Sequence, residues 1–96
     1  MKKYKLIYSD EALKNLREIV AYIAEDNIFK AVEYRQGIEK NISNLMEYPY
    51  SGKQTKPDKT ERVCFYRNHK IFYSVNELSG LIAIIYISHG AMKERE

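Results

Sequence analysis

The chain has 96 residues, and its 16 Lys and Arg residues outnumber its 13 Asp and Glu residues, which gives a net charge of +3 at pH 7. This length suits one domain, so we expect a single domain over residues 1–96. No apolar run approaches the roughly 20 residues of a membrane helix. No apolar segment follows the basic N-terminus either, so we expect a cytoplasmic protein without a membrane partner.

The first predicted elements are a strand and a helix. Lys3–Tyr8 reads "KYKLIY", whose alternation predicts a strand. Ser9 or Asp10 then offers a side-chain oxygen that can cap a helix. Apolar residues follow at steps of three and four, which predicts a helix that ends at about Glu25 and buries one face. The members of this stripe are Ala12, Leu13, Leu16, Ile19, Val20 and Ile23.

A second helix is predicted after a short break, with Asn27 as its cap. Its apolar stripe consists of Ala31, Tyr34, Ile38, Ile42 and Leu45, and Pro49 and Gly52 end it. Gly37 within the stripe leaves room for a close approach of the two helices. The short connection predicts an antiparallel helical hairpin.

Three strand-like segments complete the chain: Thr60–Arg67, Lys70–Val75 and Leu81–His89. In the second of them Ile71, Tyr73 and Val75 alternate with Phe72 and Ser74. The short connections predict an antiparallel meander. The order is then β-α-α-β-β-β, an α+β fold in which the helical hairpin packs on one face of a small antiparallel sheet. The opposite face would be partly free to bind a partner.

Positive charge gathers in the second half of the chain. Between Gly52 and Lys70, six cations stand against two carboxylates, and the cations are Lys53, Lys56, Lys59, Arg62, Arg67 and Lys70. Such a patch suits nucleic acid or an acidic protein segment, although a solvated loop and strand face would look the same. Tyr66 and Tyr86 lie on strand faces whose orientation the pattern does not fix. Tyrosines interleaved with Arg and Lys are able to stack bases and to bond phosphates.

The two histidines and the cysteine give no catalytic or metal motif. His89 lies at the exit of the last strand, before Gly90, where an imidazole suits proton exchange, a phosphate contact or a bond to neighbouring backbone. We interpret His69 as a polar turn residue and Cys64 as a small strand residue. The spacing of these residues fits no metal site, and we expect no metal or cofactor.

Taken together, the order and spacing of these segments resemble the RelE/ParE superfamily of type II toxin–antitoxin toxins. The resemblance runs from "SDEALKNLREIVAYIAEDN" through "LMEYPYSGK" and "ERVCFYRNHKIFYSV" to "IIYISHGA". The ending "HGA" is most similar to the ParE branch. In that branch an arginine usually follows, whereas this chain has Met92 and then Lys93.

The resemblance implies one of three functions. A ParE-like toxin stalls DNA gyrase on cleaved DNA, and we expect this activity. A RelE- or YoeB-like toxin instead cuts mRNA on the ribosome; in that case Lys70 matches a catalytic arginine, His89 lies near a C-terminal histidine, and Arg62 and Arg67 supply charge. No clear carboxylate base or terminal aromatic residue matches that group. The third alternative is a toxin fold that has lost its activity and only binds.

The resemblance also implies a cognate antitoxin whose C-terminal tail wraps the toxin. We expect an amphipathic helix on the helical hairpin, near Leu16, Ile23, Tyr34 and Ile38, and an extended segment on the sheet. The residues expected to bind the target are Arg62, Arg67, Tyr86, His89 and Lys93. Underlying these expectations is one hypothesis, that the cationic side chains share the sheet surface that the helices leave uncovered.

Overall fold

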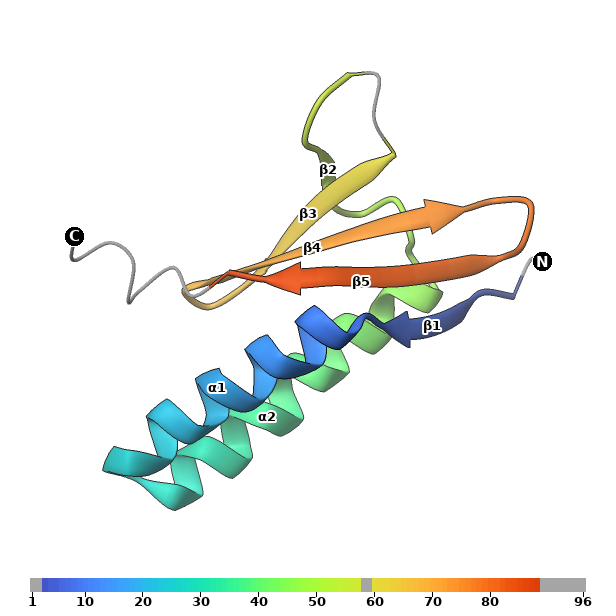
Figure 1. Ribbon diagram of the computed structural model, residues 1–96. Helices are drawn as coiled ribbons and strands as arrows, with labels where there is room; N and C mark the ends of the chain where they lie inside the picture. The colour runs from blue at the N-terminus through green and yellow to red at the C-terminus, as the bar shows by residue number, and fades with distance from the viewer. Residues whose placement is uncertain (1–2, 58–59, 89–96) are drawn as a thin grey trace.

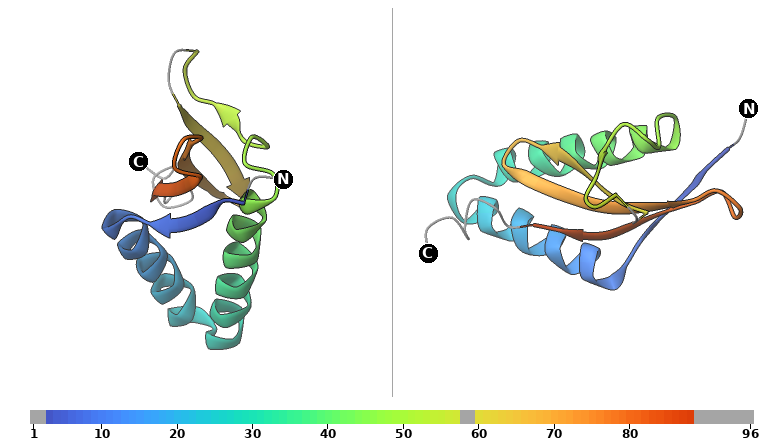
Figure 2. Two further views of the ribbon diagram at one scale, coloured as in Figure 1. Left: turned by 90° about the vertical axis from the view of Figure 1, so that its right-hand side faces the viewer. Right: turned by 90° about the horizontal axis from the view of Figure 1, so that it is seen from above.

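The computed structural model describes residues 3–57 and 60–88, which form two helices on one side of a five-stranded sheet (Figure 1). In chain order the elements are β1 (Lys5–Tyr8), α1 (Asp10–Asp26), α2 (Ile28–Ser43), a 3-10 turn η1 (Asn44–Met46), β2 (Lys53–Gln54), β3 (Glu61–Tyr66), β4 (His69–Asn76) and β5 (Leu81–Ile87). The α+β class and the helical hairpin are confirmed. Both helices lie on the same side of β4 and β5 (Figure 2).

The two helices begin at the caps that the sequence predicted. The Ser9 hydroxyl oxygen accepts a hydrogen bond from the Ala12 backbone N–H at 2.9 Å. Asn27 Oδ1 accepts one from the Lys30 N–H at 3.0 Å. Asn27 is the single residue between the end of α1 at Asp26 and the start of α2 at Ile28. A connection this short forces the helices to run antiparallel. Within residues 3–57, neither helix combines the length and apolar character that a membrane crossing requires.

The sheet is mixed, which corrects the expected antiparallel sheet. Its strand order is β1-β5-β4-β3-β2. The β3–β4 and β4–β5 pairs are antiparallel as predicted, but β1 pairs in parallel with β5. Parallel neighbours require a long connection, and here the helical hairpin and strands β2 to β4 lie between β1 and β5 in the chain. The two-residue strand β2, which pairs with β3, was not predicted.

The core lies between the helical stripes and one face of β4 and β5. Ile71, Tyr73 and Val75 of β4 are buried, as their alternation predicted. On β5 the buried residues are Ile82, Ile84 and Ile87, and the register to β4 shifts beside Tyr73. These six side chains meet the buried residues of α1 and α2, chiefly Ala12, Leu16, Ile19, Tyr34, Ile38 and Ile42.

Side chains at the start of α1 provide hydrogen-bond partners for backbone groups of β5, close to the point where the register between β4 and β5 shifts. The Ser9 hydroxyl donates to the Ile85 carbonyl at 2.6 Å, and the Ile87 N–H donates to Asn15 Oδ1 at 2.9 Å. Asn15 is only 6% exposed, and its amide also donates to Glu11. Buried backbone groups need such partners, so these two polar side chains dock α1 on β5 at a fixed position.

The hydroxyl of Tyr73 holds the segment that follows the second helix. It donates to the Pro49 carbonyl at 2.8 Å and accepts from the Gly52 N–H at 2.9 Å. A side chain at position 52 would not fit, because a Cβ there would lie 2.6 Å from the Tyr73 hydroxyl oxygen and 2.8 Å from the Val63 carbonyl oxygen. The buried phenol thus anchors an irregular segment to the middle of the sheet.

Gly37 makes room for a strand residue rather than for the other helix. A Cβ at this position would clash with the hydroxyl of Tyr66, which comes from β3. The expectation that Gly37 brings the two helices together is therefore corrected. The Tyr66 ring in turn packs edge-on against Tyr34, with ring centroids 5.1 Å apart.

We predict that Tyr73→Phe lowers the free energy of unfolding by about 1–3 kcal/mol, because the Pro49 carbonyl and the Gly52 N–H both lose a buried partner. Urea denaturation of the purified protein measures this change. Tyr48→Phe is the matched control, since Tyr48 is 65% exposed and its hydroxyl lies outside the core. Equal stability of the two variants would contradict the anchoring role.

Candidate functional site

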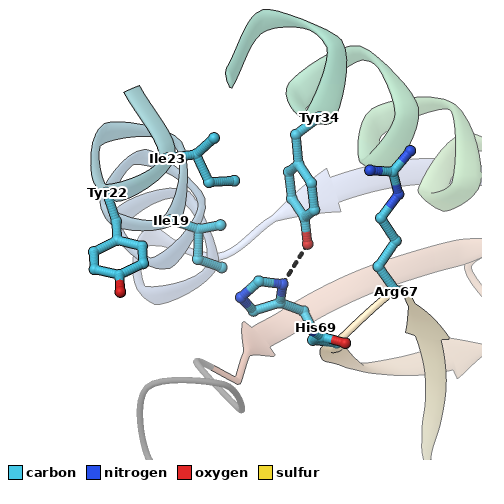
Figure 3. A pocket seen from close by; sticks show the side chains of 7 residues that line it. Ile19, Tyr22, Ile23, Tyr34, Arg67 and His69 are labelled. Carbon is cyan, nitrogen blue, oxygen red and sulfur yellow. Dashed lines mark hydrogen bonds between the residues drawn. The ribbon is translucent and has the colours of Figure 1, made fainter. Parts of the chain in front are cut away.

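A cavity of about 260 Å³ lies between the paired helices and the turn that joins β3 to β4 (Figure 3). Its walls come from three parts of the chain, namely Ile19, Tyr22 and Ile23 of α1, Tyr34 of α2, and Arg67, Asn68 and His69 of the turn and β4. Apolar and aromatic side chains therefore line the cavity together with one guanidinium, one amide and one imidazole. A cavity with few polar groups among apolar walls is the usual form of a binding site for a small group.

Tyr34 and His69 meet at this cavity through a hydrogen bond between the Tyr34 hydroxyl and His69 Nδ1 (Figure 3). Tyr34 is 6% exposed. Burial, followed by the neighbouring Tyr66, raises the pKa of the Tyr34 hydroxyl to about 12 despite the opposing effect of Arg67. The hydroxyl therefore stays protonated at neutral pH and is able to donate to the imidazole.

Arg67 lies at the turn and has a backbone angle φ of +54°, in the left-handed region that residues other than glycine rarely adopt. Its guanidinium carbon is 5.3 Å from the centroid of the Tyr66 ring and 5.9 Å from that of Tyr34. These distances suit cation–π contacts. The turn thus places one cation over two tyrosine rings at the edge of the cavity, on the side of the sheet that the helices cover.

Arg62 is engaged elsewhere, near the segment that follows α2. Its Nη1 donates to the Gly52 carbonyl at 2.6 Å and approaches the Tyr50 carbonyl at 3.5 Å. The guanidinium also lies 4.8 Å from the centroid of the Tyr50 ring. Two backbone oxygens and an aromatic face thus hold this side chain in a structural position.

Lys70 and Tyr86 lie on the face of the sheet opposite the helices. Lys70 is exposed and pairs with Phe65 of β3. Tyr86 stacks on Phe72, with ring centroids 4.3 Å apart and an angle of 10° between the rings. Partial burial and the nearby carboxylate of Glu61 raise the pKa of the Tyr86 hydroxyl.

The predicted cations therefore do not share one surface, which corrects the hypothesis drawn from the sequence. Successive residues of a strand point to opposite faces, so Lys70 points away from the cavity that its neighbour His69 lines. Arg67 lies over the tyrosines on the helix side, and Arg62 is bonded near the other end of β3. His89 and Lys93, the remaining predicted target-binding residues, lie outside the described residues.

Most of the predicted antitoxin-binding residues lie in the core. Leu16, Tyr34 and Ile38 are at most 6% exposed, because the apolar stripes of both helices face the sheet. A partner would reach them only after the core had opened. Ile23 is partly buried and lines the cavity. Tyr22, which also lines the cavity, is 48% exposed.

The sequence interpretation missed His69, which it treated as a polar turn residue. The turn has only two residues, Arg67 and Asn68, so His69 already belongs to β4. Its spacing of two from Ile71, a core residue, was the signal that places it on the helix side.

Cys64 and the acidic side chains of the described part of the chain form no chemical site. Cys64 packs against the core, and burial raises the pKa of its thiol to about 11, which keeps it protonated and unreactive at neutral pH. Among residues 3–57 and 60–88, no three His, Cys, Asp or Glu side chains gather closely enough to hold a metal ion.

A family model, described as the ParE toxin of the type II toxin–antitoxin system parDE, matches residues 6–94. A comparison of the sequence with curated proteins finds no match. Among solved structures, the chain is similar to one from the chromosomal ParDE system of P. aeruginosa, with a TM-score of 0.75, 16% identity, and coverage of 92% of this chain and 97% of that one.

Two solved structures from E. coli have the same fold. The intact RelBE toxin–antitoxin complex gives a TM-score of 0.65 at 17% identity, covering 88% of this chain and 94% of that one. The isolated RelE toxin gives a TM-score of 0.63 at 16% identity, covering 96% of this chain and 94% of that one. At identities this low, these structural matches show only that the fold is shared, with two helices packed on a sheet.

We predict that Tyr34→Phe lowers the free energy of unfolding by about 1 kcal/mol at pH 7, because the hydrogen bond between the Tyr34 hydroxyl and His69 is lost. The difference in the free energy of unfolding between this variant and the unmodified chain should shrink as pH rises from 10 towards 12. In the unfolded chain the Tyr34 hydroxyl ionises near pH 10, whereas in the folded chain its raised pKa keeps it protonated up to about pH 12. The unfolded state is therefore favoured over this range, and the stability that the hydroxyl contributes is lost.

Chemical denaturation at several pH values measures this dependence. Tyr22→Phe is the matched control, because Tyr22 lines the same cavity but is half exposed. A difference between Tyr34→Phe and the unmodified chain that stays constant up to pH 12 would contradict the raised pKa.

Proposed function

The chain belongs to the ParE toxin family of type II toxin–antitoxin systems, and on that premise we propose that it poisons DNA gyrase and is neutralised by a cognate antitoxin. The family model covers residues 6–94, which is nearly the whole chain. The proposal assigns residues 1–96 to one toxin domain. It requires no reaction catalysed by the chain itself, only a surface that engages the gyrase–DNA complex.

The separation of the cations is the observation that carries this proposal. Cutting mRNA requires positive groups that converge on one phosphate and a neighbouring group that transfers protons. In the described part of the chain, Arg62 is bonded to backbone carbonyls, and Arg67 and Lys70 lie on opposite faces of the sheet. This arrangement supports a binding poison better than a nuclease.

A second candidate, ribosome-dependent mRNA cleavage, is favoured by the cavity alone. There a phenol, an imidazole and a guanidinium lie together, in Tyr34, His69 and Arg67. Such groups are able to transfer protons and to stabilise charge. Against this candidate, the phenol is buried under apolar walls and its hydroxyl is engaged by the imidazole.

We place the antitoxin contact at the junction of the two helices rather than on their buried stripes. Four apolar side chains there are exposed, namely Tyr22 (48%), Ile28 (66%), Phe29 (86%) and Val32 (51%). Phe29 and Val32 lie three positions apart and share one face of α2. An exposed apolar patch on a helix suits the apolar face of a partner helix.

A gyrase cleavage assay tests the proposed target. Purified protein added to gyrase, ATP and plasmid should inhibit supercoiling and accumulate linear, protein-linked DNA, and the cognate antitoxin should reverse both effects. If gyrase is unaffected while ribosome-bound mRNA is cut, the second candidate is correct. If neither occurs, the chain is a toxin fold that only binds.

We predict that Phe29→Asp weakens antitoxin binding by at least about 30-fold, the cost of losing a central apolar contact. Isothermal titration calorimetry with the purified antitoxin measures the affinity. Leu78→Asp is the control, because Leu78 is a fully exposed apolar residue in the turn between β4 and β5. Unchanged affinity in Phe29→Asp would remove the helix junction from the antitoxin interface.

A further inference from the structure

Three aromatic rings lie on the face of the sheet that the helices leave uncovered. Phe65 of β3 is 58% exposed, Tyr86 of β5 is 36% exposed, and Phe72 of β4 is half-buried. They alternate with the core residues of their strands, so they point away from both helices. Several large rings that lie together on a solvent-exposed face indicate an interaction site, whereas a single exposed ring is common and indicates none.

The strand register arranges these rings in two adjacent rows. The first row crosses four strands as Lys53, Val63, Phe72 and Tyr86, each paired with the next. Strand spacing makes this row about 14 Å long. The second row, two residues further along, pairs Phe65 with Lys70 at a distance of about 7 Å from the first. Each row thus combines an aromatic ring with a lysine.

The stacked pair gives the first row a defined geometry. The rings of Phe72 and Tyr86 are nearly parallel, with centroids 4.3 Å apart. Two rings that stack on each other have fewer orientations open to them, so less freedom is lost when a third flat group joins the stack. Nucleobases are such flat groups. Every base is able to stack on an aromatic side chain, so this contact depends little on the sequence of the nucleic acid.

The charge of this face is predominantly positive. Its charged strand residues in the described part of the chain are Lys5, Lys53 and Lys70, together with the carboxylate of Glu61. Glu61 already accepts a hydrogen bond from the Thr55 hydroxyl at 2.9 Å. Lysine is depleted from the cores of protein interfaces, whereas lysines between aromatic rings are typical of surfaces that bind single-stranded nucleic acid.

We propose that this face binds an unpaired DNA strand, whose bases stack on Phe65 and on the Phe72–Tyr86 pair while phosphates contact Lys53 and Lys70. In a duplex the faces of the bases are covered by their neighbours, so the platform selects unpaired bases. The choice of DNA over RNA rests on the proposed function, since a gyrase poison meets broken DNA strands. The surface itself is independent of that function.

Fluorescence anisotropy with a labelled single-stranded DNA oligonucleotide tests the proposal. Tyr86→Ala and Phe65→Ala should each weaken binding at least about fivefold, because each removes one stacking platform. Tyr86→Phe, which keeps the ring, should bind as the unmodified chain does. Tyr48→Ala is the control for an exposed aromatic residue away from this face and should also leave binding unchanged.

The salt dependence tests the role of lysine. Lys70→Ala should weaken binding and reduce the slope of log K against log salt by about 0.7, the value for one phosphate contact on a single strand. An unchanged slope would remove Lys70 from the phosphate contacts and overturn that part of the proposal.

Several results would overturn the proposal as a whole. They are no binding of single-stranded DNA at low salt, equal binding of duplex, tighter binding of single-stranded RNA, or a dimer of the chain that Phe65→Ala dissociates. The gyrase assay on the same preparation separates this proposal from the proposed function. Poisoning without strand binding refutes only the strand-binding surface, and strand binding without poisoning refutes only the gyrase target.

Discussion

The register of β4 decides which side chains the molecule buries and which it presents. Ile71, Tyr73 and Val75 meet the helical stripes, so Lys70 and Phe72 must face away from them. A slip of one residue would exchange the two sets completely. The Tyr73 hydroxyl adds a polar restraint to this apolar one, because it reaches the backbone on both sides of Tyr50 and leaves only one register in which those groups are paired.

Two different surfaces follow from this division of the sheet. On the helix side, the turn after β3 closes a small cavity with Tyr34, Arg67 and His69, where apolar walls dominate. The other side carries aromatic rings and lysines in register. The alternation along β4 puts His69 on the side of the cavity and Lys70 on the other face, so Arg67, at the edge of that cavity, and Lys70 do not converge on one point.

Local patterns in the sequence predicted the parts of the fold that depend on neighbours along the chain. The helical stripes, the Ser9 and Asn27 caps and the meander are of this kind. The parallel β1–β5 pair and the site itself depend on distant residues. Arg62 shows the difference, because its charge is visible in the sequence but its bonds to carbonyls ten or more residues away are not. The burial of Leu16, Tyr34 and Ile38 has a related cause, because an apolar stripe predicts that a helix face is buried without showing which element covers it.

The core and both surfaces depend on which face of β4 and β5 meets water, and NMR with a soluble paramagnetic probe measures that directly. The probe should strongly broaden the ring signals of Phe65, Phe72 and Tyr86, while those of Tyr34 and Tyr73 stay sharp. Broadening of Tyr73 together with protection of Phe72 would show the opposite register. The core, the cavity and the aromatic face described here would then all be wrong.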